Sequence, residues 1–174
     1  MAITTTKLES NRGFALIENG ASAITNSTTE TSLFSTTVKG GQMSTNKIAE
    51  LQLVFHVTTP AISIPTLVLK VKLGTAVTTI ATGTLGSSIT DKPFILTASI
   101  ANQNATNVQY MYAKLDNSSL GINLFSALGA GSTVADATWA VDTAVDQVLS
   151  VTAQFGGLSA TTSIVTKLVK LNLS

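Results

Sequence analysis

The chain has 174 residues, of which 44% are hydrophobic and only 11% charged, and its formal net charge is +1. This length suits one domain, or one domain with an arm, and argues against two enzyme-sized domains. The weak charge argues against nucleic-acid binding as a main function, and the absence of cysteine excludes disulfides, thiolate chemistry and cysteine-based zinc sites.

The first 30 residues differ from the rest of the chain. Loop-forming residues at positions 4–6, 18–20 and 26–29 surround one apolar patch, which contains Phe14, Leu16 and Ile17. We therefore predict an extended N-terminal arm over residues 1–30, with these three side chains contacting a neighbouring subunit. The start lacks the basic and apolar runs of a signal peptide, and no stretch approaches the ~20 apolar residues of a membrane span. These features predict synthesis in a cytoplasm and no membrane partner.

From residue 31 onward the pattern is that of β-strands. Residues 31–38 form the first predicted strand, and residues 48–57 alternate clearly between apolar and polar positions. In the second of these segments Leu51, Leu53 and Phe55 share one face, and His56 lies on the other. Each segment therefore predicts a strand with one face toward a core.

The middle of the chain continues this alternation. Residues 67–73 and 77–81 predict a hairpin that turns at Gly74, whereas Gly83 and Gly86 are interpreted as turn residues. Further strands are predicted over residues 93–100 and 108–113. In the last of these, Tyr110 and Tyr112 occupy one side of the strand.

The C-terminal third adds three more strands. Residues 116–119 predict a turn, and residues 122–128 fit either a short strand or one helical turn. Strands are then predicted over residues 134–141, 147–155 and 163–173. Eight or so strands without a helical pattern of 10 residues predict an all-β fold, either a sandwich or a barrel. A single jelly-roll β-sandwich over residues 31–174 fits the strand count best.

Candidate catalytic and metal-binding groups are few. His56 is the only histidine, so it lacks the partners that a metal site or a general base requires, and a place on a polar face or an interface is the preferred interpretation. Asp136, Asp142 and Asp146 form the densest acidic stretch, but their spacing is not that of a calcium loop. Asp142 is expected to bond to its own backbone in an Asx-type turn. We therefore assign no catalytic, cofactor-binding or metal-binding residue and expect no cofactor.

Aromatic side chains offer one further binding hypothesis. Trp139, Tyr110 and Tyr112 are the residue types on which sugar rings stack, but aromatic residues make up only 5% of the chain. Roles in the core or in subunit contacts are the preferred interpretation.

Four segments together carry a resemblance to a known family. Residues 31–36 (TSLFST), 67–79 around Gly74, 92–98 (KPFILTA) and 141–155 (VDT followed by LSVTAQF) resemble motifs of small jelly-roll proteins from tailed-bacteriophage virions. These proteins include capsid decoration or cement proteins, head fibres and tail-tip modules. Phe94 and Phe155 stand where tryptophan is common in the family, and either ring can fill a core pocket.

The resemblance implies a non-enzymatic virion structural protein, assembled in the host cytoplasm. Its leading role would be capsid decoration or cement, binding between subunits of the major capsid protein as a homotrimer. A tail-fibre or receptor-binding module, with residues 102–107 at the host surface, remains an alternative, as does a single-jelly-roll major capsid protein. A small carbohydrate-active enzyme using Asp136, Asp142 or Asp146 is the alternative from another class.

Overall fold

The computed structural model describes residues 5–10, 13–18, 23–127, 131–159 and 161–174, with side chains from residue 23 onward. Within these ranges every regular element is a β-strand, which confirms the all-β prediction. The same part of the chain contains no helix that is long and apolar enough to span a membrane.

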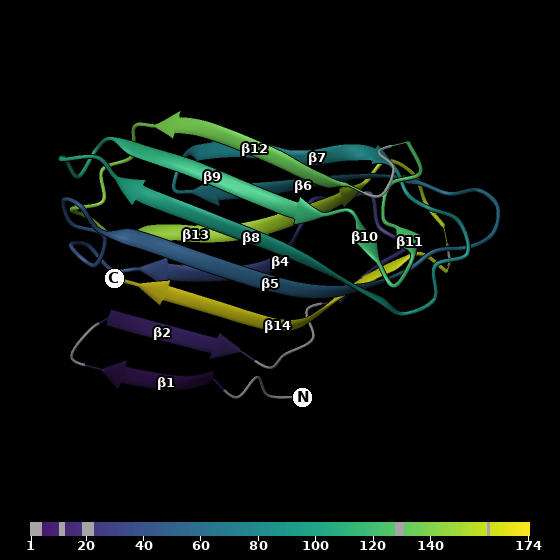
Figure 1. The fold of residues 1–174 in the computed structure, drawn as a ribbon, viewed down its shortest axis with the longest axis horizontal. Coiled ribbons are helices and arrows are strands. Elements are labelled where there is room, and N and C mark those ends of the chain that lie inside the picture. The colour runs from purple at the N-terminus through teal and green to yellow at the C-terminus, as the bar shows by residue number, and fades with distance from the viewer. Residues whose placement is uncertain (1–4, 11–12, 19–22, 128–130, 160) are drawn as a thin grey trace.

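The larger sheet is antiparallel and contains eight strands in the order β1-β2-β14-β5-β8-β9-β12, with β3 also paired to β14 (Figure 1). Its strands are β1 (Thr5–Ser10), β2 (Gly13–Glu18), β3 (Ala23–Thr25), β5 (Ile48–Thr58), β8 (Lys92–Asn102), β9 (Gln109–Asp116), β12 (Ser132–Trp139) and β14 (Ser163–Leu173). Because β14 comes last in the chain but lies beside β5, the C-terminal strand holds the N-terminal strands to the sandwich.

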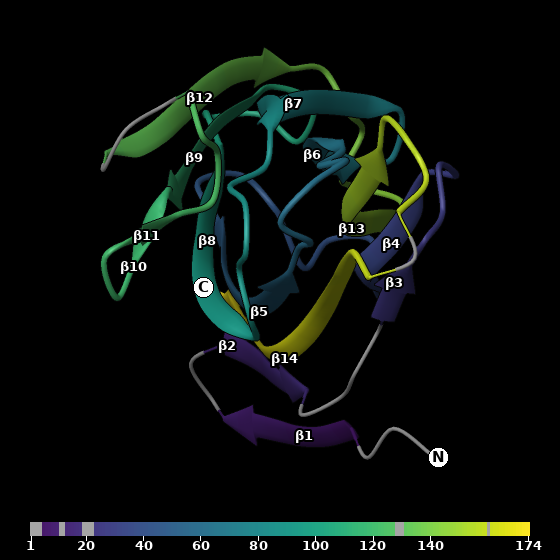
Figure 2. The same cartoon turned by 90° about the vertical axis from the view of Figure 1, so that its right-hand side faces the viewer.

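The smaller sheet has four strands in the order β4-β13-β6-β7, and β10 and β11 form a separate two-stranded ribbon. The bounds are β4 (Thr31–Val38), β6 (Thr66–Leu73), β7 (Ala76–Thr84), β10 (Ser118–Ser119), β11 (Ile122–Asn123) and β13 (Gln147–Phe155). The chain crosses repeatedly between the two sheets, which curve around a common interior in Figure 2. This arrangement confirms the predicted sandwich of jelly-roll type.

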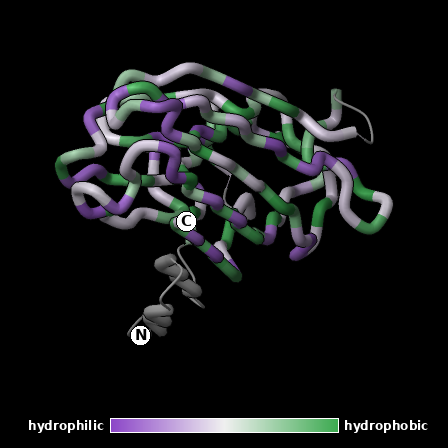
Figure 3. The backbone as a smooth tube through the Cα atoms, turned by 60° about the vertical axis from the view of Figure 1, so that its left-hand side comes forward, coloured by the Kyte–Doolittle hydropathy of each residue, from purple (hydrophilic) through white to green (hydrophobic). Residues whose placement is uncertain are grey.

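The core follows the alternation that the sequence contains. On β5, Leu53, Phe55 and Val57 are fully buried, whereas His56 between them is only half-buried. On β6 the apolar positions from Leu67 to Leu73 are likewise buried at every second residue. Hydrophobic and hydrophilic positions alternate along the strands in Figure 3. Because strand side chains point alternately to opposite faces, the buried set faces the space between the sheets.

Side-chain hydrogen bonds join the two sheets on both sides of the sandwich. The Trp139 indole Nε1 on β12 donates to Thr78 Oγ1 on β7 at 3.0 Å. On the other side of the sandwich, the Thr166 hydroxyl on β14 donates to the Leu33 carbonyl on β4 at 2.9 Å. Trp139 is buried, so its ring belongs to the core, which is one of the two roles that the sequence analysis preferred for it. The two sheets are thereby fixed to each other on both sides.

Two glycines of the β6–β7 hairpin have different functions. Gly74 forms the predicted turn and has a φ of +54°, a backbone conformation that favours glycine. Gly83 was expected in a turn, but this prediction is wrong because β7 continues to Thr84. A Cβ at Gly83 would lie 3.1 Å from Cδ1 of Phe125, so the absence of a side chain makes room for that buried ring.

The predicted arm contains two parts with different relations to the sandwich. Strands β1 and β2 form a hairpin that is paired to the edge of the large sheet at β14 (Figure 1). After it, β3 pairs with the other end of β14, and Ile24 on β3 is buried in the core. Among the described side chains, Ile24 on β3 is the first to lie in the core, and the backbone of the hairpin before it is paired with β14.

Candidate functional site

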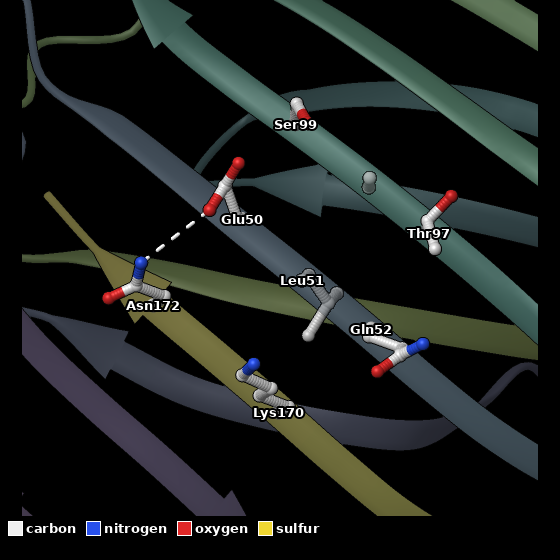
Figure 4. A pocket seen from close by; sticks show the side chains of 8 residues that line it. Glu50, Leu51, Gln52, Thr97, Ser99, Lys170 and Asn172 are labelled. Atoms are coloured by element: carbon white, nitrogen blue, oxygen red, sulfur yellow. Dashed lines mark hydrogen bonds between the residues drawn. The ribbon is translucent and has the colours of Figure 1, made fainter.

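The outer face of the large sheet carries a hollow of about 220 Å³ over β5, β8 and β14 (Figure 4). Its lining consists mainly of polar residues from three strands that are far apart in the sequence: Glu50, Leu51, Gln52, Thr97, Ala98, Ser99, Lys170 and Asn172. Leu51 and Ala98 are buried because they point to the core, so the polar members form the exposed surface of the hollow. We call this site the polar hollow.

Strand register explains why these polar side chains lie together. In one row across the sheet, Asn172 pairs with Glu50, and Glu50 pairs with Ser99. In the parallel row, Lys170 pairs with Gln52, and Gln52 pairs with Thr97. Directly paired residues on one face have Cβ atoms about 5 Å apart. The polar hollow therefore contains two rows of neighbouring donors and acceptors.

Tyr112 extends the first row beyond the polar hollow. Tyr112 on β9 pairs with Ser99, and Asp136 on β12 pairs with Tyr112. Tyr112 is 41% exposed and Tyr110, two residues before it on the same face, is 39% exposed. From β14 to β12 the row crosses five strands, which at about 4.8 Å per strand spacing gives roughly 19 Å. Aromatic and polar groups thus share one surface row, which we call the outer row.

The charges around the polar hollow are balanced. Glu50 accepts a long hydrogen bond of 3.5 Å from the Asn172 amide, shown by the dashed line in Figure 4, and Lys170 supplies an ammonium group to the same lining. On β9, Lys114 lies 3.0 Å from Asp116, and this contact lowers the pKa of the Asp116 carboxyl, with Ser132 as a second donor. The surface therefore offers hydrogen-bonding groups without a strong field of either sign.

A second cluster of charged residues lies on the outer face of the small sheet. Glu30, just before β4, accepts hydrogen bonds from Lys70, Lys72 and the Thr152 hydroxyl, at 2.7 Å for Lys70 and 2.8 Å for Thr152. Lys70 in the first place, then Lys72 and Thr152, lower the pKa of Glu30 from 4.5 to about 2. The side chains are about one-quarter exposed, at 24% to 27% for the three charged groups. This cluster joins β4, β6 and β13.

Replacing Glu30 by glutamine is expected to lower the free energy of unfolding by about 1–3 kcal/mol at pH 7, because one acceptor oxygen and the negative charge between two lysines are lost. Since folding lowers the pKa of Glu30 from 4.5 to about 2, the wild-type advantage is complete above pH 4.5 and is lost as the pH falls toward 2. Urea unfolding at pH 7 and pH 3 measures both effects. Asp136→Asn, at an exposed position, is the matched control. A difference between wild type and E30Q that is equal at both pH values would contradict this account.

His56 takes the polar-face position that the sequence predicted. It is half-buried on β5, and its Nδ1 lies 2.9 Å from Oδ1 of Asp91. The hydrogen bond from His56 is the main reason why the pKa of Asp91 is lowered. This pair connects β5 to the loop before β8.

The three aspartates weighed as catalytic acids occupy different settings. Asp136 lies in the outer row, whereas Asp146 accepts hydrogen bonds from Lys39 Nζ at 2.7 Å and the Gly40 backbone at 2.9 Å. These two contacts, Lys39 first, lower the pKa of Asp146. Asp142 accepts a hydrogen bond of 2.9 Å from the Ala144 N–H, which confirms the predicted Asx-type turn. Asp142 thus fixes its own turn, whereas Asp146 holds the turn after β4, which is 106 residues away in the chain.

The predicted contact residues of the arm all lie on β2, where the structure describes the backbone. Phe14 pairs with Leu173, Leu16 with Leu171, and Ile17 with Lys170. Their side chains lie outside the described residues. The strand register therefore places this segment beside β14, next to the β14 residues that line the polar hollow.

The sequence did not predict the polar hollow, whereas it did suggest the loop at residues 102–107 as a host contact. No local signal indicated the hollow, because its residues come from three separate strands. Asn102, the first residue of the loop proposed as a host contact, is buried and donates hydrogen bonds to the backbone carbonyls of Met43 and Ser44. Its amide therefore points inward and holds the loop between β4 and β5.

Strand order and the polar hollow define the molecule as an all-β sandwich with a polar outer face. No protein-family model and no curated protein matches the sequence. Similar solved structures include peanut lectin with a bound peptide, at 6% identity and a TM-score of 0.37, covering 99% of this chain and 85% of the lectin. The CBM2 module of the evolved Dit of Lactobacillus casei BL23 phage J-1 shows 13% identity and a TM-score of 0.37, covering 97% and 79%. A structure of the infectious bursal disease virus Gt strain shows 11% identity and a TM-score of 0.26, covering 98% and 41%.

Proposed function

We propose that this protein is a non-enzymatic structural protein of a phage virion, which decorates or cements the capsid by binding between subunits of the major capsid protein. The proposal builds on the resemblance of the four strand motifs to virion jelly-roll proteins. The observation that carries it is the N-terminal hairpin. Strands β1 and β2 extend the large sheet beyond β14, so the chain presents a terminal segment that can bind a neighbouring subunit.

The physical basis is the pairing between β2 and β14. Residues Phe14–Glu18 pair with residues Val169–Leu173 in antiparallel register. Backbone hydrogen bonds of this kind do not depend on a particular partner sequence, so the edge of a neighbouring sheet can substitute for the chain's own β14. Exchange of a terminal element between copies is a low-cost way to assemble subunits. The hairpin is therefore suited to link neighbouring subunits.

The composition supports dense packing of copies on a shell. A net charge of +1 on 174 residues produces little repulsion between neighbours. Repeated attachment at many sites also raises the overall avidity without new contacts. In this proposal the copies associate as homotrimers on the virion.

Removing residues 1–22 is expected to abolish binding to capsids assembled without this protein. Burying one large apolar side chain contributes about 1.5–3 kcal/mol, so the loss of three such contacts raises the Kd for the capsid by about a thousandfold or more. Co-sedimentation with the capsids measures the effect. The deletion ends before β3 because Ile24 is part of the core, so a cut after residue 28 would also damage the sandwich.

Two further variants separate attachment from folding. The full-length triple variant Phe14→Ser, Leu16→Ser and Ile17→Ser keeps the chain length, and Val134→Ser with Val148→Ser changes exposed valines outside the hairpin. The triple variant should lose capsid binding and the control should keep it, with both sandwiches folded by circular dichroism. Unchanged occupancy for the deletion and the triple variant would overturn the proposal.

A further inference from the structure

We propose that the outer face of the large sheet is a saccharide-binding site, which takes a neutral oligosaccharide along the outer row from Asn172 to Tyr112. This inference goes beyond capsid attachment and does not depend on the N-terminal hairpin. It rests on three observations: the polar hollow of about 220 Å³, the register that aligns its side chains, and the exposed Tyr112, which continues one row beyond the hollow.

The polar side chains of the hollow match the chemistry of sugar hydroxyls. Each hydroxyl is both a donor and an acceptor, and it is best bound by a carboxylate or an amide next to a second polar group. Glu50 supplies an acceptor, and the Asn172 and Gln52 amides supply both kinds of group. The Ser99 and Thr97 hydroxyls follow in the same two rows. Neighbouring ring hydroxyls can therefore find partners on adjacent strands.

Tyr112 supplies the apolar surface that the polar groups lack. Tyr112 is 41% exposed although it pairs with Ser99 on one neighbouring strand and with Asp136 on the other, and Tyr110 on the same face is 39% exposed. A phenol ring has a flat apolar face and a polar hydroxyl, so it can cover the C–H face of a sugar ring while remaining hydrated at its edge. An aromatic platform beside a polar hollow is thus arranged for a ligand with both kinds of surface.

The balance of charge indicates a neutral ligand. Glu50 and Lys170 lie in the same hollow, and Asp136 on β12 continues the outer row beyond Tyr112. Because Lys170 and Lys114, which pairs with Thr97, offset Glu50 and Asp136, this face has no excess of positive charge that would attract a polyanion such as a nucleic acid. A protein partner would require a more apolar centre than these polar rows provide. A neutral glycan satisfies both constraints.

The test is a titration of the full-length protein with a panel of neutral oligosaccharides, namely gluco-, galacto- and N-acetylhexosamine oligomers, followed by two-dimensional NMR and calorimetry. At least one oligosaccharide should bind and shift resonances of residues 50–52, 97–99, 112 and 170–172. Tyr112→Ala should raise the Kd at least about tenfold, because an aromatic contact of 1.4 kcal/mol or more is lost. Glu50→Gln, which keeps the side-chain shape, should raise it at least about threefold.

The matched control is Val77→Ala, at an exposed position on β7 in the other sheet, and this variant should leave the Kd unchanged. The protein without residues 1–22 should retain saccharide binding, which separates this proposal from capsid attachment. Failure of every oligosaccharide to bind would overturn the inference. So would binding of only heparin or a protein partner to this face, or a Kd that stays within twofold of wild type in both Y112A and E50Q.

Discussion

Replacing Phe55 by alanine is expected to lower the free energy of unfolding by about 3–5 kcal/mol. Phe55 is fully buried at the pairing of β5 with β8, directly opposite Phe94 in register. The two ring centroids lie 6.2 Å apart at an interplanar angle of 32°, within the range of favourable aromatic pairs. Truncation removes the transfer free energy of the ring and leaves a cavity between the sheets, since the neighbouring side chains on both sheets are held by strand pairing.

Urea unfolding followed by Trp139 fluorescence measures this loss, because Trp139 is the only tryptophan and is buried between β12 and β7. Val148→Ala, at a position 49% exposed on β13, should change stability by less than about 0.5 kcal/mol. A loss below about 1 kcal/mol for F55A would show that the space between the sheets is not packed as described.

Replacing Gln109 by leucine is expected to lower the free energy of unfolding by about 2–4 kcal/mol, which is the second large effect. Gln109 is fully buried at the start of β9, and its side chain pairs with the backbone of Val141 like a neighbouring strand. Its Nε2 donates to the Val141 carbonyl at 3.0 Å, and its Oε1 accepts from the Val141 N–H at 3.0 Å. Leucine offers neither group, and each buried backbone group left without a partner costs about 1–3 kcal/mol.

Gln103→Leu is the matched control, because it makes the same chemical change at an exposed position of the neighbouring loop. Unfolding in urea should separate the two variants clearly, and hydrogen exchange at the Val141 amide should accelerate only in Q109L. Equal stability losses in both variants would mean that the Val141 backbone does not depend on the Gln109 side chain.

The strands were predictable from the sequence where one face of each is buried. Buried positions such as Leu53 and Phe55 alternate with the polar His56, so the two-residue period of a strand can be recognised within this short segment alone. The turn at Gly74 and the bond of Asp142 to the Ala144 amide were likewise predictable, because the residues involved lie within a few positions of each other. Local patterns thus gave the elements and several of their connections.

The sites were not predictable because they depend on strand order. Glu30 lay within the predicted arm, but its partners Lys70 and Thr152 are 40 and 122 residues away. The polar hollow similarly requires β14 to lie beside β5, so that Asn172 meets Glu50. No local period encodes which strands become neighbours, and an exposed polar residue has the same appearance in sequence whether or not it belongs to a site.

The hairpin and the polar hollow share strand β14, which links the two proposals in space. One edge of β14 pairs with β2, and the other edge pairs with β5, whose outer face lines the hollow. Attachment through the hairpin would leave the outer face of β5 and β8 available to a ligand. A decorating protein with this geometry could therefore hold the shell on one side and present a binding face on another.

The most direct test of the proposed function is cryo-electron microscopy of phage particles assembled in cells that produce this protein. We predict density for the sandwich on the outside of the capsid, at junctions between capsid subunits and in groups of three, with residues 5–18 lying against a neighbouring subunit. Density for the chain only at the tail tip, or its absence from the particle, would contradict the proposal.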